Sequence, residues 1–236
     1  MQGYSHGGRR ARPMICGLVA LISAIFPWIS PSTAAPGEAA QNICARAAAQ
    51  TEAIQGLPTL ILGAISLAET GRWDHAQEAS FAWPWTVTSG SDARYLATKA
   101  AVIAVVEAMQ TRGVTHIDVG CMQINLGYHP DAFASLDQAF DPLANAAYAG
   151  RFILQLQDTQ GSWSHTIASY HSSTRKYGLP YLKRVQRLWM TERRRLAELE
   201  RDTRMEEYKA QKPAWPKPFH RWSRSRSCRG TDDGPP

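Results

Sequence analysis

The amino-acid sequence predicts a mainly helical α+β fold with one small β-hairpin, followed by a charged helix and a disordered tail. Three observations support this prediction. Several stretches between residues 41 and 190 repeat apolar residues at helical spacing, and residues that commonly cap helices border them. Only one short stretch has the composition of a β-strand followed by a turn. Residues 191–236 are rich in charge and proline, a composition that does not bury a core.

Residues 1–35 have the composition of a secretory signal peptide. An arginine-rich start precedes an apolar stretch from Met14 to Ile29, and small residues follow at positions 32–35. Pro27 interrupts the apolar stretch, which is short for a membrane span, and a retained anchor is the alternative. No second apolar stretch is long enough to cross a bilayer. We therefore expect an exported protein with no stable membrane span.

Residues 41–190 form one predicted domain, large enough to bury a core. They carry 11 basic and 11 acidic side chains, whereas residues 191–236 carry 12 basic and 8 acidic ones. The positive charge of the mature chain therefore lies in the tail. The segment from Arg221 to Arg229 contains a tryptophan among arginines and has the composition of a nucleic-acid contact, but export argues against that partner. We expect the tail to contact anionic envelope polymers or another protein of the envelope.

The predicted helices follow one another through the domain. The first is rich in alanine and runs from Asn42 to Gly56, and the second has Pro58 in its first turn and ends at Glu69. Three more are predicted from Thr98 to Arg112, from Asp141 to Gly161 and from Ser164 to Tyr170.

The β-hairpin and the C-terminal helix complete the prediction. Residues 83–88 are expected to form a strand, and residues 93–96 to return beside it after a turn. From Tyr181 to about Lys209, opposite charges recur three and four positions apart, which indicates a solvated helix. The proline-rich and arginine-rich residues after Lys212 are predicted to be disordered.

Three cysteines remain after removal of the signal peptide: Cys44, Cys121 and Cys228. An exported protein can keep a disulfide. Cys228 lies in the polar tail, whereas Cys44 lies in the first predicted helix and Cys121 in the most motif-like stretch. We predict a disulfide between Cys44 and Cys121, with two independent buried thiols as the alternative, because sequence does not give their separation.

Glu69 is the candidate catalytic residue. Three isoleucine or leucine residues lie eight, seven and four positions before it, so at 3.6 residues per turn its side chain projects from an apolar helix face. Poor solvation raises the pKa of a carboxyl group, which lets it donate a proton near neutral pH. The alternative is a glutamate at a helix end whose side chain turns into water.

Three other segments carry side chains suited to binding sugars: residues 83–85, residues 118–125 and residues 167–173. Amides form paired hydrogen bonds with hydroxyl and N-acetyl groups, and aromatic rings stack on sugar faces. None of the segments is specific alone. Trp83 and Trp85 are equally suited to packing in a core.

Together these residues resemble the soluble lytic transglycosylase family, which is related to goose-type lysozyme. The resemblance covers about residues 43–185 and depends on Glu69-Thr70-Gly71, Gly120-Cys121-Met122-Gln123-Ile124-Asn125 and Ala168-Ser169-Tyr170-His171-Ser172. The sequence is most similar to the branch that accompanies envelope-spanning secretion or flagellar machines, through Trp83-Pro84-Trp85-Thr86-Val87, Phe140-Asp141-Pro142 and Asn145.

The resemblance implies a lysozyme-like fold, a periplasmic location and an enzyme that cleaves the β-1,4 bond between N-acetylmuramic acid and N-acetylglucosamine in peptidoglycan. By the family mechanism Glu69 acts alone, first as acid and then as base, and the product is a 1,6-anhydro sugar. No cofactor is implied. The alternatives are a hydrolytic lysozyme and a non-catalytic peptidoglycan-binding component of a secretion or flagellar machine.

The resemblance also assigns roles around Glu69, and it implies a set of substrate-binding residues: Thr70, Met122, Gln123, Asn125, Tyr170 and His171. Gln123 and Asn125 match amides that hold the substrate or shape the site. Tyr170 matches a tyrosine whose hydroxyl orients the catalytic carboxyl, and Met122 matches an apolar residue that faces the cleft.

The sequence departs from the family pattern at two positions. Thr70 replaces the usual serine and keeps the hydroxyl, whereas His171 replaces the usual asparagine and changes the contacts expected of the third motif. Asp118 is either a structural cap or a second catalytic residue. No pair of histidines in these segments has the helical spacing of a zinc site, so we expect no metal.

Overall fold

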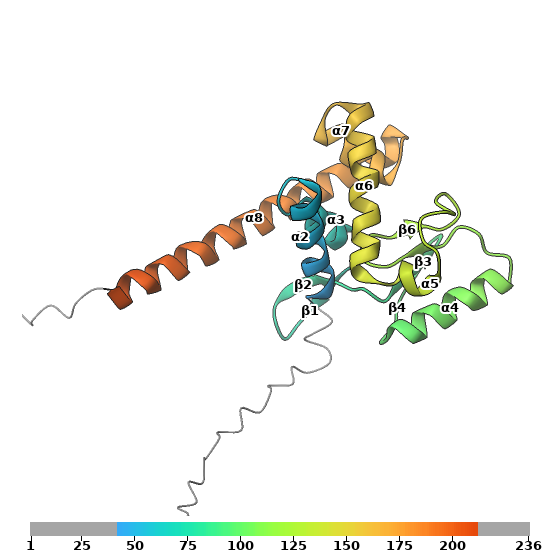
Figure 1. The fold of residues 1–236 in the computed structure, drawn as a ribbon, viewed down its shortest axis with the longest axis horizontal. Helices are drawn as coiled ribbons and strands as arrows, with labels where there is room; N and C mark the ends of the chain where they lie inside the picture. Colours follow the sequence, from blue (N-terminus) through green and yellow to red (C-terminus); the bar gives the residue numbers. More distant parts are fainter. Residues whose placement is uncertain (1–41, 212–236) are drawn as a thin grey trace, which may run out of the picture. The chain divides into compact units, whose positions relative to one another are not determined.

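The computed structural model describes residues 42–211. This part of the chain is mainly helical with small antiparallel sheets, in agreement with the predicted α+β class (Figure 1). The predicted signal peptide, Cys228 and the predicted disordered tail lie outside the described residues. Within residues 42–211, no helix combines the length and apolar character needed to span a membrane.

The helices are α2 (Ile43–Gln55), α3 (Ile61–Thr70), α4 (Lys99–Thr111), α5 (Leu136–Ala139), α6 (Pro142–Gln160), α7 (Trp163–His171) and α8 (Arg175–Gln211). Local signals explain why several predicted ends agree closely with these bounds. The Asp141 side chain accepts a hydrogen bond from the Ala144 N–H at the start of α6, and Gly161 ends that helix in the left-handed conformation. α3 begins at Ile61, after a turn, and the short helix α5 was not predicted.

The strands form two antiparallel sheets, one of β1 (Gly71–Asp74) and β2 (Ala79–Ala82), the other ordered β4-β3-β5-β6. The second contains β3 (Thr86–Ser89), β4 (Asp92–Tyr95), β5 (Asp118–Val119) and β6 (Ile124–Asn125). The hairpin of β3 and β4 confirms the predicted one. The hairpin of β1 and β2 was missed because its short strands lack an alternating apolar pattern.

The core has two parts. In the first, α3 contacts α2, α6, α8 and the β1–β2 hairpin, and its Ile61, Leu62 and Ile65 side chains are fully buried. In the second, apolar side chains of β3, β5 and α4 pack on Phe140. α3 is therefore enclosed on most sides, and its C-terminal end reaches the edge of the first core.

A disulfide joins Cys44 of α2 to Cys121, in the turn between β5 and β6. The two Cα atoms are 5.6 Å apart and both residues are buried, so the predicted pairing is confirmed. The bridge closes a loop of 77 residues. It ties the first helix of the described chain to the segment that contains the second motif.

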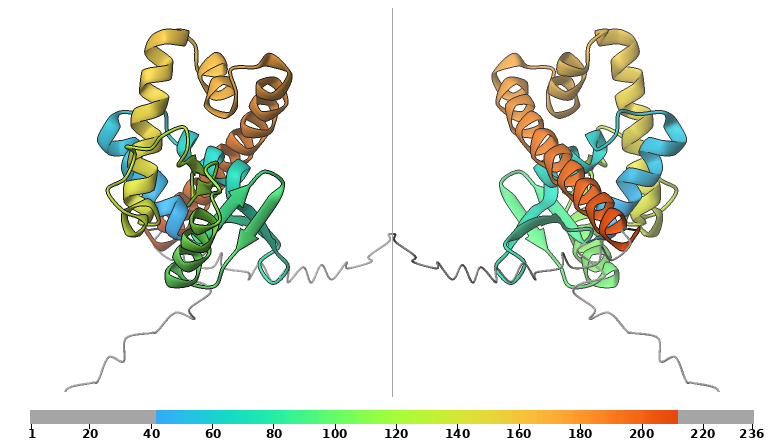
Figure 2. Two further views of the ribbon diagram at one scale, coloured as in Figure 1. Left: turned by 90° about the vertical axis from the view of Figure 1, so that its right-hand side faces the viewer. Right: turned by 90° about the vertical axis from the view of Figure 1, so that its left-hand side faces the viewer.

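α8 is one continuous helix across residue 190, where the sequence predicted a domain boundary. Its first half packs against α3 and α7 (Figure 2). Tyr181, Leu182 and Val185 of this half are buried. From residue 193 to residue 211 every side chain is exposed. The change from packed to solvated helix therefore happens within a single element.

Candidate active site

Glu69 lies in the last turn of α3, directly before β1. Most of α3 is buried, but Glu69 is partly exposed and can be reached from solvent. Burial is the main cause that raises the pKa of its carboxyl group to about 7. The negative charge of Asp118 raises this pKa further, whereas Tyr181 and the positive charge of Arg184 lower it.

The opposite end of α3 is held by Glu52 of α2. Its buried carboxylate accepts hydrogen bonds from the backbone N–H groups of Leu60 at 2.7 Å, Leu62 at 2.7 Å and Gly63 at 3.2 Å. These groups belong to the helix start, which has no intrahelical acceptors for them. Burial raises the pKa of Glu52, and the three hydrogen bonds oppose that rise. The cap fixes the helix that carries Glu69.

Tyr181 of α8 lies beside the Glu69 carboxyl, a contact that the sequence analysis missed. Its hydroxyl lowers the pKa of Glu69, and burial together with Glu69 raises the pKa of Tyr181. The hydroxyl lacks the geometry of a full hydrogen bond to the carboxyl and has no other partner among residues 42–211. No local pattern signals this contact, because the two residues are far apart in the sequence.

Tyr170 of α7 also lies near the carboxyl. Its hydroxyl donates a hydrogen bond to the Met122 carbonyl at 2.8 Å, whereas the family resemblance predicted a bond to Glu69. Burial and then the nearby Glu69 raise the pKa of Tyr170. Tyr170 therefore holds the second motif in place beside Glu69.

Asp118 and Asn125 face each other across β5 and β6. The Asn125 Nδ2 donates to Asp118 Oδ1 at 2.8 Å, and the Asn125 Oδ1 accepts from the N–H groups of Gly127 and Tyr128, both at 3.0 Å. Asn125 thus shapes the site through contacts within the protein. Burial raises the pKa of Asp118, while the bond from Asn125 and nearby histidines lower it.

His171 is exposed at the end of α7, and its ring stacks on the ring of Tyr181. The ring centres are 4.5 Å apart and the planes differ by 7°. Desolvation lowers the pKa of His171, and Asp118 opposes that change. His171 therefore covers the tyrosine that contacts Glu69.

The Gln123 side chain forms hydrogen bonds with three neighbouring groups of the protein. Its Oε1 accepts from the Thr88 hydroxyl at 2.6 Å, and its Nε2 donates to the carbonyls of Gly120 at 3.0 Å and Thr86 at 3.3 Å. Its backbone has a φ of 47°, a conformation that is uncommon outside glycine. These bonds join the second motif to β3, so Gln123 shapes the site.

Met122 and Thr70 are fully buried, so neither side chain faces a cleft. The Thr70 hydroxyl donates to the carbonyls of Ser66 at 3.1 Å and Cys121 at 3.3 Å. The family resemblance predicted that both residues contact substrate. Here Thr70 joins the end of α3 to the second motif, and Met122 packs in the first core.

Asn145 of α6 fixes the backbone of the second motif. Its Oδ1 accepts from the Met122 N–H at 2.9 Å, and its Nδ2 donates to the carbonyls of Val119 at 3.0 Å and Ala139 at 3.1 Å. Gly120 has a φ of 77°, and a Cβ there would lie 2.7 Å from the Asn145 Nδ2. The glycine is required both by its conformation and by this close approach.

Trp83 and Trp85 have different roles. The Trp83 indole N–H donates to the Leu96 carbonyl at 2.7 Å, and the ring remains partly exposed. Trp85 packs against the second core.

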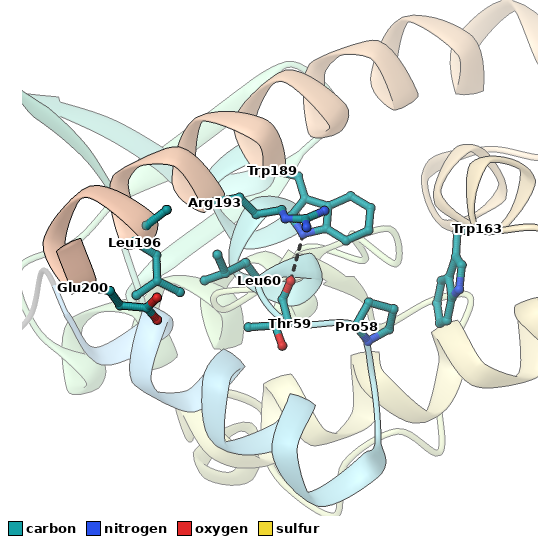
Figure 3. Close-up of a pocket in the computed structure, with 9 residues that line it drawn as sticks. Pro58, Thr59, Leu60, Trp163, Trp189, Arg193, Leu196 and Glu200 are labelled. Atoms are coloured by element: carbon teal, nitrogen blue, oxygen red, sulfur yellow. Dashed lines mark hydrogen bonds between the residues drawn. The ribbon is translucent and has the colours of Figure 1, made fainter. Parts of the chain in front are cut away.

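Two cavities lie near α3. One of about 500 Å³ lies before the start of the helix and is lined by Thr59, Leu60 and the side chains of Trp163 and Trp189, among others (Figure 3). It lies at the end of α3 opposite Glu69, which is about 13 Å along the helix from Leu60. A smaller one of about 270 Å³ is lined by Leu67 and Gly71, on either side of Glu69 in the chain, and by Arg184 among others.

The arrangement suits proton transfer by one carboxyl group to a substrate that reaches the end of α3. Within residues 42–211, no three side chains of His, Cys, Asp or Glu gather closely enough to hold a metal ion. Comparisons with protein-family models, curated proteins and solved structures find no match to this chain.

Proposed function

We propose that this protein is a periplasmic peptidoglycan lytic transglycosylase with a lysozyme-like fold. The observation that carries the proposal is the Glu69 carboxyl, whose pKa of about 7 suits it to give and take a proton at neutral pH. The three motifs of the family resemblance meet around this carboxyl through Thr70, Met122 and Tyr170, which supports the same conclusion.

The proposed reaction has two steps. Glu69 gives its proton to the glycosidic oxygen, the bond to C1 of N-acetylmuramic acid breaks, and the N-acetyl oxygen stabilises the positive centre. The Glu69 carboxylate then takes the proton of the 6-hydroxyl as that oxygen bonds to C1. The product is a 1,6-anhydro ring, water is not consumed, and Glu69 is again protonated.

Tyr181 and Arg184 suit the charged stage of this cycle. Both lower the pKa of Glu69, which means that both stabilise the carboxylate formed after the first proton transfer. The Tyr181 hydroxyl has no hydrogen-bond partner among residues 42–211, so it can donate to the carboxylate that forms during the reaction.

Hydrolysis is the second candidate, and Asp118 is the observation that favours it. A second carboxyl group near the acid can activate water in a glycosidase. Asp118 is close enough to influence the pKa of Glu69, but one of its oxygens already accepts a hydrogen bond from Asn125. Because this oxygen is already hydrogen-bonded, the structure favours the transglycosylase mechanism, which needs no second carboxylate.

The test is product analysis on purified sacculi with the protein and its Glu69→Gln variant. We expect anhydro-muropeptides from the unchanged protein and none from the variant. Glu107→Gln is the matched control, because Glu107 is exposed on α4, a helix whose main contacts are with α5 and β3. Products heavier by one water would establish hydrolysis instead. If Glu69→Gln released as much product as the unchanged protein, Glu69 would not be the catalytic residue. If neither the unchanged protein nor its variants released product but all bound sacculi, the protein would be a non-catalytic peptidoglycan-binding protein.

The link to a secretion or flagellar machine remains a prediction from the family resemblance. The exposed half of α8 and the basic residues after it are the segments that we expect to contact such a machine or anionic envelope polymers.

A further inference from the structure

Arg72 of β1 lies three residues after Glu69 and is stacked against two aromatic rings. Its guanidinium carbon is 5.0 Å from the centre of the Trp83 ring and 5.1 Å from the centre of the Tyr95 ring. Both separations are within the range of cation–π attraction. The guanidinium group is therefore held in a defined place at the surface.

Two hydrogen bonds hold Trp83 beside the end of α3 and next to Tyr95. The Trp83 N–H donates to the Thr70 carbonyl at 3.1 Å, which ties the tryptophan to the residue after Glu69. The Trp83 indole N–H donates to the Leu96 carbonyl at 2.7 Å, next to Tyr95. Three residues of extended chain span at most about 10 Å, so Arg72 and Glu69 occupy the same end of the fold.

The hydrogen-bond donors of Arg72 are unused in the described chain. Stacking covers the face of a guanidinium group and leaves its N–H groups free at the edge. Within residues 42–211, the Arg72 side chain makes no hydrogen bond and no ion pair. Arg94 of the neighbouring β4 differs, because it pairs with Asp92. Arg72 and Tyr95 are both exposed, so a ligand can reach this edge.

We propose that Arg72 binds a carboxylate on the peptide stem of the substrate, next to the glycosidic bond that Glu69 acts on. This inference rests on the proposed function. Carboxylates match the planar donor edge of arginine with two parallel hydrogen bonds. The two rings immobilise the side chain before the substrate arrives, which lowers the entropy lost on binding. The site would make the enzyme prefer glycan strands whose stems carry free carboxylates.

The test compares two substrates: soluble glycan–peptide strands with free stem carboxylates, and the same strands after carbodiimide coupling to ammonia, which converts the carboxylates to amides. For the unchanged protein we expect kcat/KM to fall about tenfold on amidation, the loss of a hydrogen-bonded charge pair at an exposed site. Arg72→Gln should act on both substrates at the lower rate. Arg94→Gln is the matched control and should retain the preference.

The two proposals fail in different ways. If the unchanged protein releases anhydro products equally from both substrates, or if Arg72→Gln keeps the preference for free carboxylates, the role of Arg72 is overturned and the proposed function stands. If the unchanged protein releases no product from the free-carboxylate strands, the proposed function itself fails. The comparison of substrates uses the unchanged protein, so it remains decisive even if Arg72→Gln unfolds.

Discussion

A carboxyl group with a pKa of about 7 is present as acid and as base in similar amounts at neutral pH. This balance suits a residue that must do both in one reaction cycle. It arises from opposed influences: burial and Asp118 favour the acid, whereas Tyr181 and Arg184 favour the carboxylate. Changing one neighbour at a time should therefore move the balance in a chosen direction.

Asp118→Asn should shift the alkaline limb of the kcat/KM profile to lower pH. Removing the negative charge lowers the pKa of Glu69, so the acid form that starts the reaction is lost at lower pH. The amide oxygen can still accept the bond from Asn125. The measurement is the rate of anhydro-product release between pH 5 and 9, a range of about two units on either side of the Glu69 pKa.

Tyr181→Phe should shift the pKa of Glu69 in the direction opposite to Asp118→Asn. It removes a hydroxyl that lowers the pKa of Glu69, so the alkaline limb should move to higher pH, while the ring that stacks on His171 is kept. Asp158→Asn, exposed on α6, should leave the profile unchanged. Shifts of the same sign in both site variants would contradict the assigned electrostatics.

Glu69→Gln should stabilise the fold at pH 8 and leave its stability at pH 4 almost unchanged. The folded pKa of Glu69 is about 7 and the ordinary value is 4.5, so the unchanged protein loses stability as pH rises through this window. Each pKa unit is worth about 1.4 kcal/mol, and partial exposure reduces the effect, so we expect a gain of about 1–3 kcal/mol at pH 8. Urea unfolding at both pH values measures it, and an equal gain at pH 4 would contradict the linkage.

At the scale of elements, α3 depends on the Glu52 carboxylate as much as on its own sequence. Glu52→Ala should lower the free energy of unfolding by about 2–4 kcal/mol, because it leaves one buried and two half-buried backbone donors without their acceptor. The loosened helix start should also reduce activity, since α3 positions Glu69. Thermal unfolding measures the first effect, with Glu107→Ala, at an exposed position of α4, as control. A variant as stable as the control would show that the cap is dispensable.

The elements predicted well from sequence are those with local signals. The Asp141 side chain caps the start of α6, and Gly161 ends that helix in the left-handed conformation. The Thr98 side chain caps the start of α4 as Asp141 caps α6. The two-residue strands β5 and β6 have no such signal, because they exist only through pairing with β3 and with each other.

The same distinction applies to the site. The apolar face of α3 predicted the raised pKa of Glu69, because a residue on that face lies where the helix packs against the rest of the fold. Glu52 and Tyr181 could not be assigned, since Glu52 reaches across a turn to the next helix and Tyr181 comes from α8. Met122 illustrates a further limit: an apolar residue within a motif can face the core as readily as a cleft, and here it is buried.

At the scale of the whole molecule, the Cys44–Cys121 disulfide links the start of the described chain to its centre. Replacing both cysteines with alanine should lower the free energy of unfolding by about 2–5 kcal/mol, because a long loop is no longer closed in the unfolded chain. Unfolding with and without reductant measures it. Reductant should destabilise the unchanged protein and have no effect on the double variant. If neither the substitutions nor the reductant changed the stability, the prediction would be wrong.

The position of Tyr181 on α8 has a consequence for the order of folding. Glu69 meets this tyrosine only after the chain has been made through residue 181, so a long segment must be organised before the contact can form. We expect the carboxyl to remain an ordinary, solvated glutamate in nascent and partly folded chains. The site would then gain its chemistry only after the chain has been made beyond residue 181 and α8 has packed on α3.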